Sequence, residues 1–376
     1  MAALRCPGLR SERVVLELEG RPAASDSAEA VRAAVGRQRA RNVAVVAGLA
    51  LLLAAMVALS LALGRYEVDF GSVAAAVAAL ANPDAPAAEE AMRHAGVLFT
   101  LRLPRVLAAL LVGTALSAAG CAYQGIFKNP MVSPDLLGAS AGACFGAAVG
   151  ILLSFGGLGM EISAFACGVI AVAASWGLSS VLARRVGNIL VLVLSGLVIG
   201  QLFQAFTSAV KFLADPNSQL PEITFWLMGG LSNADEFDVV ALAVALAVGL
   251  AGLFALRWRI NVMALGDEEA ASLGVSVKRT RLAVVGFATL LTSASVAVAG
   301  MVGWVGLIIP HLARFLVGPD HRVLLPASVL LGGSFLLAVD DVCRCIYTTE
   351  IPLSILTAII GAPLFVYLVW RQRGQR

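Results

Sequence analysis

RWRINVMALGDEEAASLGVSVKRTR, residues 257–281, is a charged stretch that stands between two apolar segments, 239–256 and 282–300. A membrane-spanning helix needs about 20 predominantly apolar residues, and each flanking segment comes close to that length. Connections between such helices that carry arginine and lysine stay on the cytoplasmic side of the membrane. The stretch therefore predicts a helical membrane protein with a cytoplasmic loop at 257–281.

A short helix is predicted inside this loop. Asp267 can cap its start and Gly274 can end it. Glu268 and Glu269 suit the first turn, because the N-terminus of a helix carries partial positive charge. A helix of about two turns does not hold together alone in water. Two interpretations stay open from these residues: a solvated connector, and a docking helix for a cytoplasmic partner.

The composition predicts an all-α, polytopic membrane protein. Of the 376 residues, 59% are hydrophobic and 14% are charged, whereas a soluble domain carries about 25% charged residues. The net charge of +3 is too small to favour a nucleic-acid partner. No Cys/His cluster has metal-ligand spacing, and no lysine stands in a phosphate-binding loop. Neither a metal nor a nucleotide is therefore expected on this chain.

Ten apolar segments predict about ten transmembrane helices. They cover residues 43–63, 106–124, 136–155, 158–183, 189–213, 238–256, 282–302, 304–317, 323–342 and 352–370. The eighth is short for a full span and contains Pro310, so we expect it to be broken or tilted. With the N-terminus in the cytoplasm, 21 of the 27 lysines and arginines fall on the cytoplasmic side, which predicts that both termini are cytoplasmic.

Two parts are expected along the chain. Residues 1–41 are rich in arginine and contain no apolar run, which predicts a cytoplasmic tail of low order. Residues 42–376 form the transmembrane domain, from which the loop 257–281 projects.

The fifth apolar segment has a polar face. Gln201, Gln204, Ser208 and Lys211 recur at helical spacing, with Thr207 beside them. Polar side chains inside a membrane are costly unless they meet each other or water. Hydrogen bonding between helices is one interpretation. A water-lined pathway through the protein is the other, and we favour it.

The third apolar segment has a glycine face. Gly138, Gly142, Gly146 and Gly150 are four residues apart. Such a stripe lets two helices approach closely in a membrane, so we expect a packing role.

Carboxylates suited to ion coupling are scarce. Asp340 and Asp341 are the nearest candidates for a proton relay, and they are predicted at the outer rim of the ninth segment. A proton-coupled carrier is expected to place ionisable groups near the middle of the membrane. The pattern weighs against an ion-coupled secondary transporter without excluding one.

Several stretches resemble the FecCD-type permeases, the transmembrane subunits of ABC importers for iron-siderophores, haem and cobalamin. They are LRLPRVLAALLVGTALSAAG (101–120), QGIFKNPMVSPDLLGASAGA (124–143), WLMGG (226–230), ALGDEEAASLGV (264–275), GMVGWVGLIIPHLARFLVGPDHRVLLPAS (300–328) and IPLSILTAIIGAPLFVYLVWR (351–371). The resemblance covers about residues 65–376 in register and leaves the tail outside it.

The resemblance implies a type II ABC importer permease with a ten-helix subunit, a homodimer and a pathway along the dimer axis. It further implies two copies of a separate cytoplasmic ATPase, which would bind ATP and Mg²⁺, and a solute-binding protein outside. The chain would then be a transport subunit without enzymatic activity or a cofactor of its own. Its location would be the bacterial cytoplasmic (inner) membrane.

Site residues follow from the same resemblance. The ATPase-docking element would comprise Gly266, Asp267, Glu268, Glu269, Ala270, Ser272, Leu273 and Gly274. Arg102, Arg105 and Arg344 would receive acidic residues of the binding protein, although arginines at a membrane rim also serve as interfacial anchors. The fifth helix would line the pathway, in agreement with its polar face. Iron-siderophore, haem and cobalamin stay open as cargo, with iron chelates favoured as the broadest class.

Overall fold

The computed structural model describes residues 24–63, 96–182, 188–346 and 349–373, and every regular element within these ranges is helical. The chain divides into two compact units, Met1–Val45 and Val46–Arg376. The predicted all-α class is confirmed.

The elements run along the chain as α2 (Ala24–Ala62), η1 (Val97–Arg102, a π-helix), α5 (Leu103–Ile126), η2 (Pro134–Leu137, a 3₁₀ turn), α6 (Ala139–Leu152), α7 (Gly156–Leu182), α8 (Asn188–Leu213), α9 (Gln219–Leu227), α10 (Glu236–Leu265), α11 (Asp267–Ser272), α12 (Val277–Ala299), α13 (Val305–Val317), α14 (His321–Cys345) and α15 (Leu353–Arg373). Within the described residues, eight helices are long and apolar enough to cross a membrane, and α6 and α13 are shorter apolar helices. Each of the ten predicted segments coincides with one of these helices. The eighth, α13, is short as expected but continuous through Pro310.

The predicted tail is partly ordered. Its residues 24–41 form the first turns of α2, so the expectation of low order was wrong for them. Residues 1–23 lie outside the described part of the chain.

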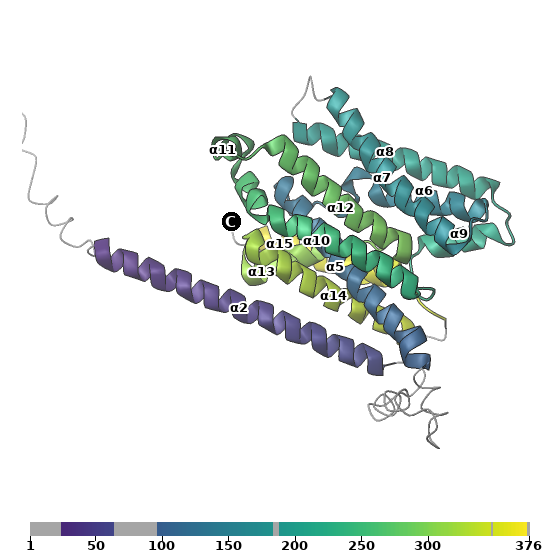
Figure 1. Cartoon of the computed structure of the whole chain (residues 1–376), viewed down its shortest axis with the longest axis horizontal. Helices are drawn as coiled ribbons and strands as arrows, with labels where there is room; N and C mark the ends of the chain where they lie inside the picture. Colours follow the sequence, from purple (N-terminus) through teal and green to yellow (C-terminus); the bar gives the residue numbers. More distant parts are fainter. Residues whose placement is uncertain (1–23, 64–95, 183–187, 347–348, 374–376) are drawn as a thin grey trace, which may run out of the picture. The chain divides into compact units, whose positions relative to one another are not determined.

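Helix α5 is the central element of the unit Val46–Arg376. It packs against α10, α12, α13 and α14, and Figure 1 shows it crossing among them. Small residues allow this: a Cβ added to Gly120 would lie 1.8 Å from the carbonyl oxygen of Gly306 in α13. Two backbones so close leave no room for side chains, and dispersion contacts between them hold the helices together.

The glycine face of α6 packs on α7, as predicted. A Cβ at Gly142 would lie 2.4 Å from the Cys167 oxygen, and one at Gly146 would lie 2.2 Å from the Ser163 oxygen. The first glycine of the stripe has another use. Gly138 has φ +83°, a left-handed conformation that favours glycine, and it joins η2 to α6.

The third predicted segment, 136–155, forms a shorter helix than expected. Its helix α6 begins only at Ala139, because Pro134–Leu137 form the 3₁₀ turn η2. This turn packs against the N-terminal half of α8, where a Cβ at Gly196 would lie 2.3 Å from the Leu136 oxygen. Non-helical backbone at such a place is tolerated when protein surrounds it. The chain therefore folds back into the bundle before α6 starts.

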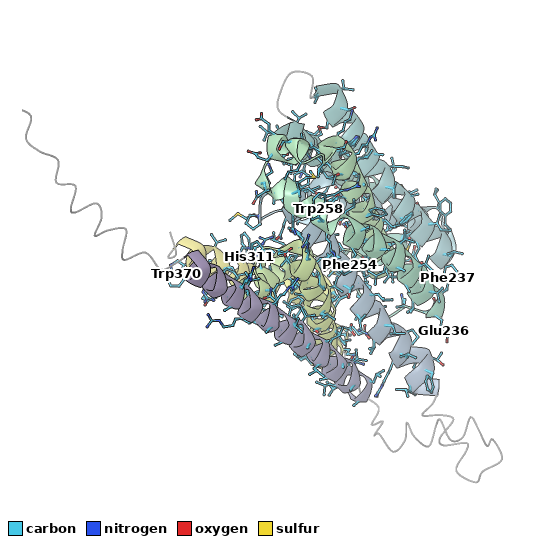
Figure 2. The ribbon with its side chains drawn as sticks, turned by 60° about the vertical axis from the view of Figure 1, so that its left-hand side comes forward. Glu236, Phe237, Phe254, Trp258, His311 and Trp370 are labelled. Carbon is cyan, nitrogen blue, oxygen red and sulfur yellow. The ribbon has the colours of Figure 1, made fainter. Side chains whose placement is uncertain are left out.

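Exposed aromatic residues mark the two ends of α10. Phe237 is 56% exposed at its start and Trp258 is 47% exposed near its end, and Figure 2 shows them far apart along the helix. Amphipathic aromatic rings favour the boundary between lipid and water. The spacing fits a helix that spans a membrane from one boundary to the other.

Candidate functional site

The five polar residues predicted to line a pathway share one cavity of about 400 Å³. Gln201, Gln204, Thr207, Ser208 and Lys211 form its α8 wall. Residues of η2 and α6, together with Leu227 and Met301, form the remaining wall. We call this space the α8 cavity.

The side chains of the polar face do not bridge α8 to other helices. The Thr207 hydroxyl donates to the Phe203 carbonyl at 2.9 Å, and the Ser208 hydroxyl donates to the Gln204 carbonyl at 3.0 Å. Both bonds lie within α8, so they satisfy the hydroxyls locally. Within the described residues, no hydrogen bond joins any of the five side chains to another helix. The geometry favours the interpretation of a water-lined surface over hydrogen bonding between helices.

Asp135 is a cavity residue that the sequence did not point to. It belongs to η2 and is exposed to the α8 cavity. The Ser140 hydroxyl at the start of α6 donates to its carboxylate. Asp135 lies between the predicted segments 106–124 and 136–155, so the sequence did not place it in the bundle. A proline–aspartate pair followed by a serine at the next helix start was the available signal.

The predicted docking helix exists as α11 (Asp267–Ser272), but its cap differs from expectation. Its N-cap residue is Gly266, and Asp267 is the first helical residue. The Asp267 carboxylate instead accepts from Arg281 Nη2 at 2.9 Å and lies 3.6 Å from Lys128 Nζ. Gly274 follows the helix with φ +78°, as predicted for its end.

These two cations set the ionisation of Asp267. Partial burial raises the pKa of its carboxyl, but the hydrogen bond and charge of Arg281, with the charge of Lys128, lower the pKa further than burial raises it. The net pKa lies below the ordinary value, so Asp267 is ionised at neutral pH. It links α11 both to α12 and to the turn that follows α5.

The other residues predicted to dock the ATPase differ in their exposure. Ala270 is fully buried. Glu268, Glu269 and Ser272 are exposed, and Leu273 is 57% exposed. An exposed leucine beside two carboxylates on a short, anchored helix is suited to protein contact.

Arg102 and Arg344 are covered and have partners within the chain. Arg102 donates to the Leu61 and Ala62 carbonyls of α2 at 2.8 and 3.3 Å. Arg344 donates to the Asp341 carboxylate and to Ser60. These contacts fasten the end of α2 to the rest of the bundle.

Arg105 is held between two carboxylates. Its guanidinium binds Asp340, which is fully buried, at 2.9 Å, and Glu350, which is 34% exposed, at 2.5 Å. Asp340 is therefore paired with Arg105, and Asp341 is paired with Arg344 at 2.5 Å, so neither candidate for the proton relay is an unpaired carboxylate. The role of the three arginines in binding a partner protein stays a prediction, and their internal contacts give them a structural role in addition.

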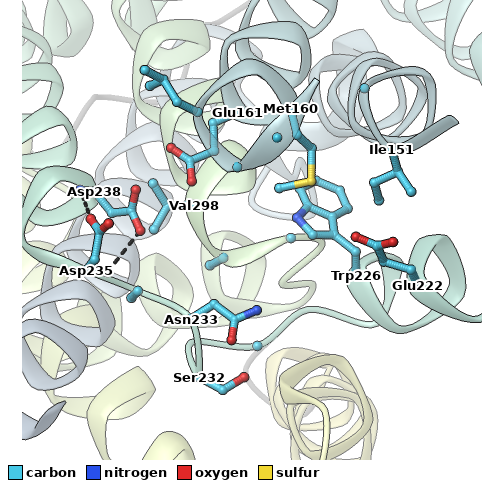
Figure 3. Close-up of a pocket in the computed structure, with 18 of the residues that line it drawn as sticks. Ile151, Met160, Glu161, Glu222, Trp226, Ser232, Asn233, Asp235, Asp238 and Val298 are labelled. Carbon is cyan, nitrogen blue, oxygen red and sulfur yellow. Dashed lines mark hydrogen bonds between the residues drawn. The ribbon is translucent and has the colours of Figure 1, made fainter. Parts of the chain in front are cut away.

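A second cavity of about 720 Å³ collects acidic residues from α7, α9 and α10. Figure 3 shows Glu161, Glu222, Asp235 and Asp238 around it. Asp235 and Asp238 form a capping box: each accepts from the backbone N–H of the other, at 2.9 and 3.0 Å. Among the described residues no group could hold a metal ion. The sequence did not predict that these carboxylates converge, and two of them serve the start of α10.

Comparison with known proteins gives one family. A sequence model of the FecCD transport family matches residues 51–371. The molybdate import system permease protein MolB of Haemophilus influenzae is 38% identical over 331 residues, which cover 88% of this chain and 96% of the relative. A Helicobacter pylori protein named "probable iron chelatin transport system permease protein" is 38% identical over 278 residues, or 74% of this chain and 83% of the relative.

A solved structure agrees with this result. The structure described as "an inward-facing conformation of a putative metal-chelate type ABC transporter" superposes with a TM-score of 0.77 at 36% sequence identity. The match covers 87% of this chain and 98% of that one.

Proposed function

Because this chain belongs to the FecCD transport family, we propose that it is the pathway-forming subunit of a metal-chelate ABC importer in the bacterial cytoplasmic membrane. It is a multi-pass membrane protein and a transport subunit rather than an enzyme. The observation that carries the proposal is the α8 cavity. Its wall combines amides, hydroxyls and an ammonium group without bonding them to other helices, which is what a solvated passage for a polar cargo requires.

The energy source in this proposal is a separate ATPase. α11 presents Glu268, Glu269 and Leu273 to solvent and is anchored through Asp267. We assign this surface to docking of the ATPase, which would carry ATP and Mg²⁺, while this chain binds no nucleotide. The positive charge concentrated on the loops of this side supports cytoplasmic termini.

A homodimer and a binding protein complete the importer. Two copies would bring two α8 cavities to a common axis, and a solute-binding protein would deliver the cargo at the opposite end. Arg102, Arg105 and Arg344 lie at that end, where Glu350 is the more exposed of the two carboxylate partners of Arg105. Acidic residues of the binding protein would have to compete with Glu350 for the Arg105 guanidinium.

The proposed cargo is an iron chelate, with haem and cobalamin chelates in the same class. The structural match to a metal-chelate transporter supports this choice. Molybdate is a second candidate, because the MolB match extends over 96% of that relative. The two candidates differ in charge and size, so one transport panel separates them.

The deciding experiment is uptake into proteoliposomes that hold this chain, its ATPase and its binding protein. The panel contains ferric siderophores, haem, cobalamin and molybdate, and a matched arm omits the ATPase. Uptake that requires the ATPase is expected, and the accepted cargo names the substrate. Uptake that persists without it would refute the importer assignment and favour an ion-coupled secondary transporter.

Docking is tested separately by reversing charge on α11. Glu268→Arg together with Glu269→Arg should abolish co-purification of the ATPase. Glu236→Arg is the matched control, because Glu236 is also exposed but stands at the opposite end of α10. Retained co-purification in the double variant would show that this surface does not dock the ATPase.

A further inference from the structure

We propose that Asp135 determines the charge selectivity of the α8 cavity and disfavours anionic cargo. The inference rests on the proposed function, since it concerns the same pathway. It starts from the position of Asp135, which lines the cavity together with the α8 polar face although it is 66 residues before Gln201 in the chain.

The position of this carboxylate is fixed by backbone packing. The η2 turn lies against α8 so closely that neither Gly196 nor Gly138 leaves room for a Cβ without displacement. Ser140 donates a hydrogen bond to the carboxylate from the first turn of α6. A side chain held from both sides keeps its place when cargo passes, which a selectivity element requires.

The charge of Asp135 is not cancelled by an ion pair. Among the residues that line the cavity, Asp135 is the one carboxylate and Lys211 the one ammonium group. Within the described part of the chain, no ion pair joins either of them to a partner. Gly196, beside η2, and Lys211 are 15 positions apart on α8, which is about 22 Å at the rise of an α-helix.

The two charges therefore act at different levels of the passage. Lys211 stands near the C-terminal end of α8, while η2, which carries Asp135, packs against Gly196 and Gly200 in its N-terminal half. An anion attracted at Lys211 would next meet the Asp135 carboxylate, which repels it in its ionised form. A neutral chelate meets no such barrier, because Coulomb interaction scales with its net charge. The arrangement favours a neutral metal chelate over an oxyanion or a highly anionic chelate.

Direct binding to the pathway tests this inference. Equilibrium dialysis with radioiron would measure the affinity of the purified permease–ATPase complex, without binding protein, for two probes. One probe is a neutral ferric trihydroxamate and the other a trianionic ferric tris-catecholate. Asp135→Asn should tighten binding of the trianion on the order of tenfold, or about 1.4 kcal/mol, and leave the neutral probe within about twofold.

Matched variants keep the result interpretable. Asp135→Glu retains the charge and should retain the wild-type preference. Lys211→Met should weaken binding of the trianion, and Glu236→Gln, which removes a charge that does not line the cavity, should change binding of neither probe. Binding of both probes unchanged in Asp135→Asn would overturn the inference.

The outcome is separable from that of the proposed function. ATPase-dependent uptake by the wild-type complex, with an unchanged charge preference in Asp135→Asn, would refute the inference alone. Absence of ATPase-dependent uptake of every cargo in the panel would refute the importer assignment, and the inference with it.

Discussion

The Arg105 pairs allow a quantitative test of what the arginines at this end of the bundle do. Asp340→Asn preserves the shape of the side chain and removes its charge. Asp340 is fully buried, and its carboxylate binds the Arg105 guanidinium through contacts of 2.9, 3.0 and 3.2 Å. The variant leaves a largely covered guanidinium, 13% exposed, with Glu350 as its remaining carboxylate.

The loss of folding stability expected for each variant follows from how deeply its carboxylate is buried. Removing one partner of a buried ion pair destabilises a protein by about 3–5 kcal/mol, because the other charge stays desolvated without compensation. Glu350 is 34% exposed, so solvent screens its pair, and Glu350→Gln should cost less than about 1 kcal/mol. At roughly 2 °C per kcal/mol for a large chain, the apparent melting temperature should fall by about 6–10 °C in Asp340→Asn and by less than about 2 °C in Glu350→Gln.

The assay is thermal unfolding of the detergent-purified chain, followed by the loss of monodisperse protein on heating. Equal, small shifts in the two variants would refute the reasoning, because they would mean that Arg105 is not held by Asp340. Binding of the solute-binding protein should be measured on the same samples. If Glu350→Gln tightens that binding while stability is kept, Arg105 serves both as an internal anchor and as a docking residue.

Three further predictions follow from single contacts. Gly146→Leu should prevent stable folding, seen as loss of monodisperse protein, because a Cβ there would lie 2.2 Å from the Ser163 oxygen of α7; a well-behaved variant would contradict this packing. Asp267→Asn should weaken ATPase binding by freeing α11 from Arg281. The pKa of Asp267 is lowered in the folded chain. The ion pairs by which Asp267 holds α11 are therefore complete above about pH 4, the ordinary pKa of an aspartate, and are lost only as the pH falls through the lowered pKa. A decline of ATPase binding between pH 8 and pH 6 would not come from this residue. Lys128→Met should retain ATPase binding and ATP hydrolysis but reduce the amount of cargo taken up per ATP hydrolysed. An unchanged ratio of uptake to hydrolysis would show that the contact of Lys128 with Asp267 does not carry motion of α11 to the cavity.

The sequence predicted those features that depend on local periodicity. The polar face of α8 could be predicted because its residues share one side of a single helix, and helical spacing alone brings them together. The glycine face of α6 could be read for the same reason, although the partner helix could not be named. All ten apolar segments were located because apolar length is a property of the segment itself.

Features that depend on contacts between distant parts of the chain could not be predicted from the sequence. Asp135 joins the cavity only because η2 packs on glycines of α8, more than 50 positions later. The charge at the start of the docking helix looked like a cap, since a local rule favours Asp there. In the structure its partners come from before and after it in the chain, Lys128 and Arg281. The covered arginines follow the same pattern, because their carbonyl and carboxylate partners belong to other helices.

A single carboxylate connects the proposed docking surface to the proposed pathway. Asp267 contacts Lys128, and Lys128 stands six positions before η2, which carries Asp135 into the α8 cavity. Lys128 has φ 52°, an uncommon conformation for a residue with a side chain, so the turn after α5 is a tightly bent connection rather than a free linker. A displacement of α11 would thus pull on Lys128 through its ion pair with Asp267, and the short chain from Lys128 to η2 would move the wall of the cavity. A carrier that draws its energy from ions in its own pathway has no need of such a link to an exposed helix, whereas a permease driven by a partner on its surface depends on one.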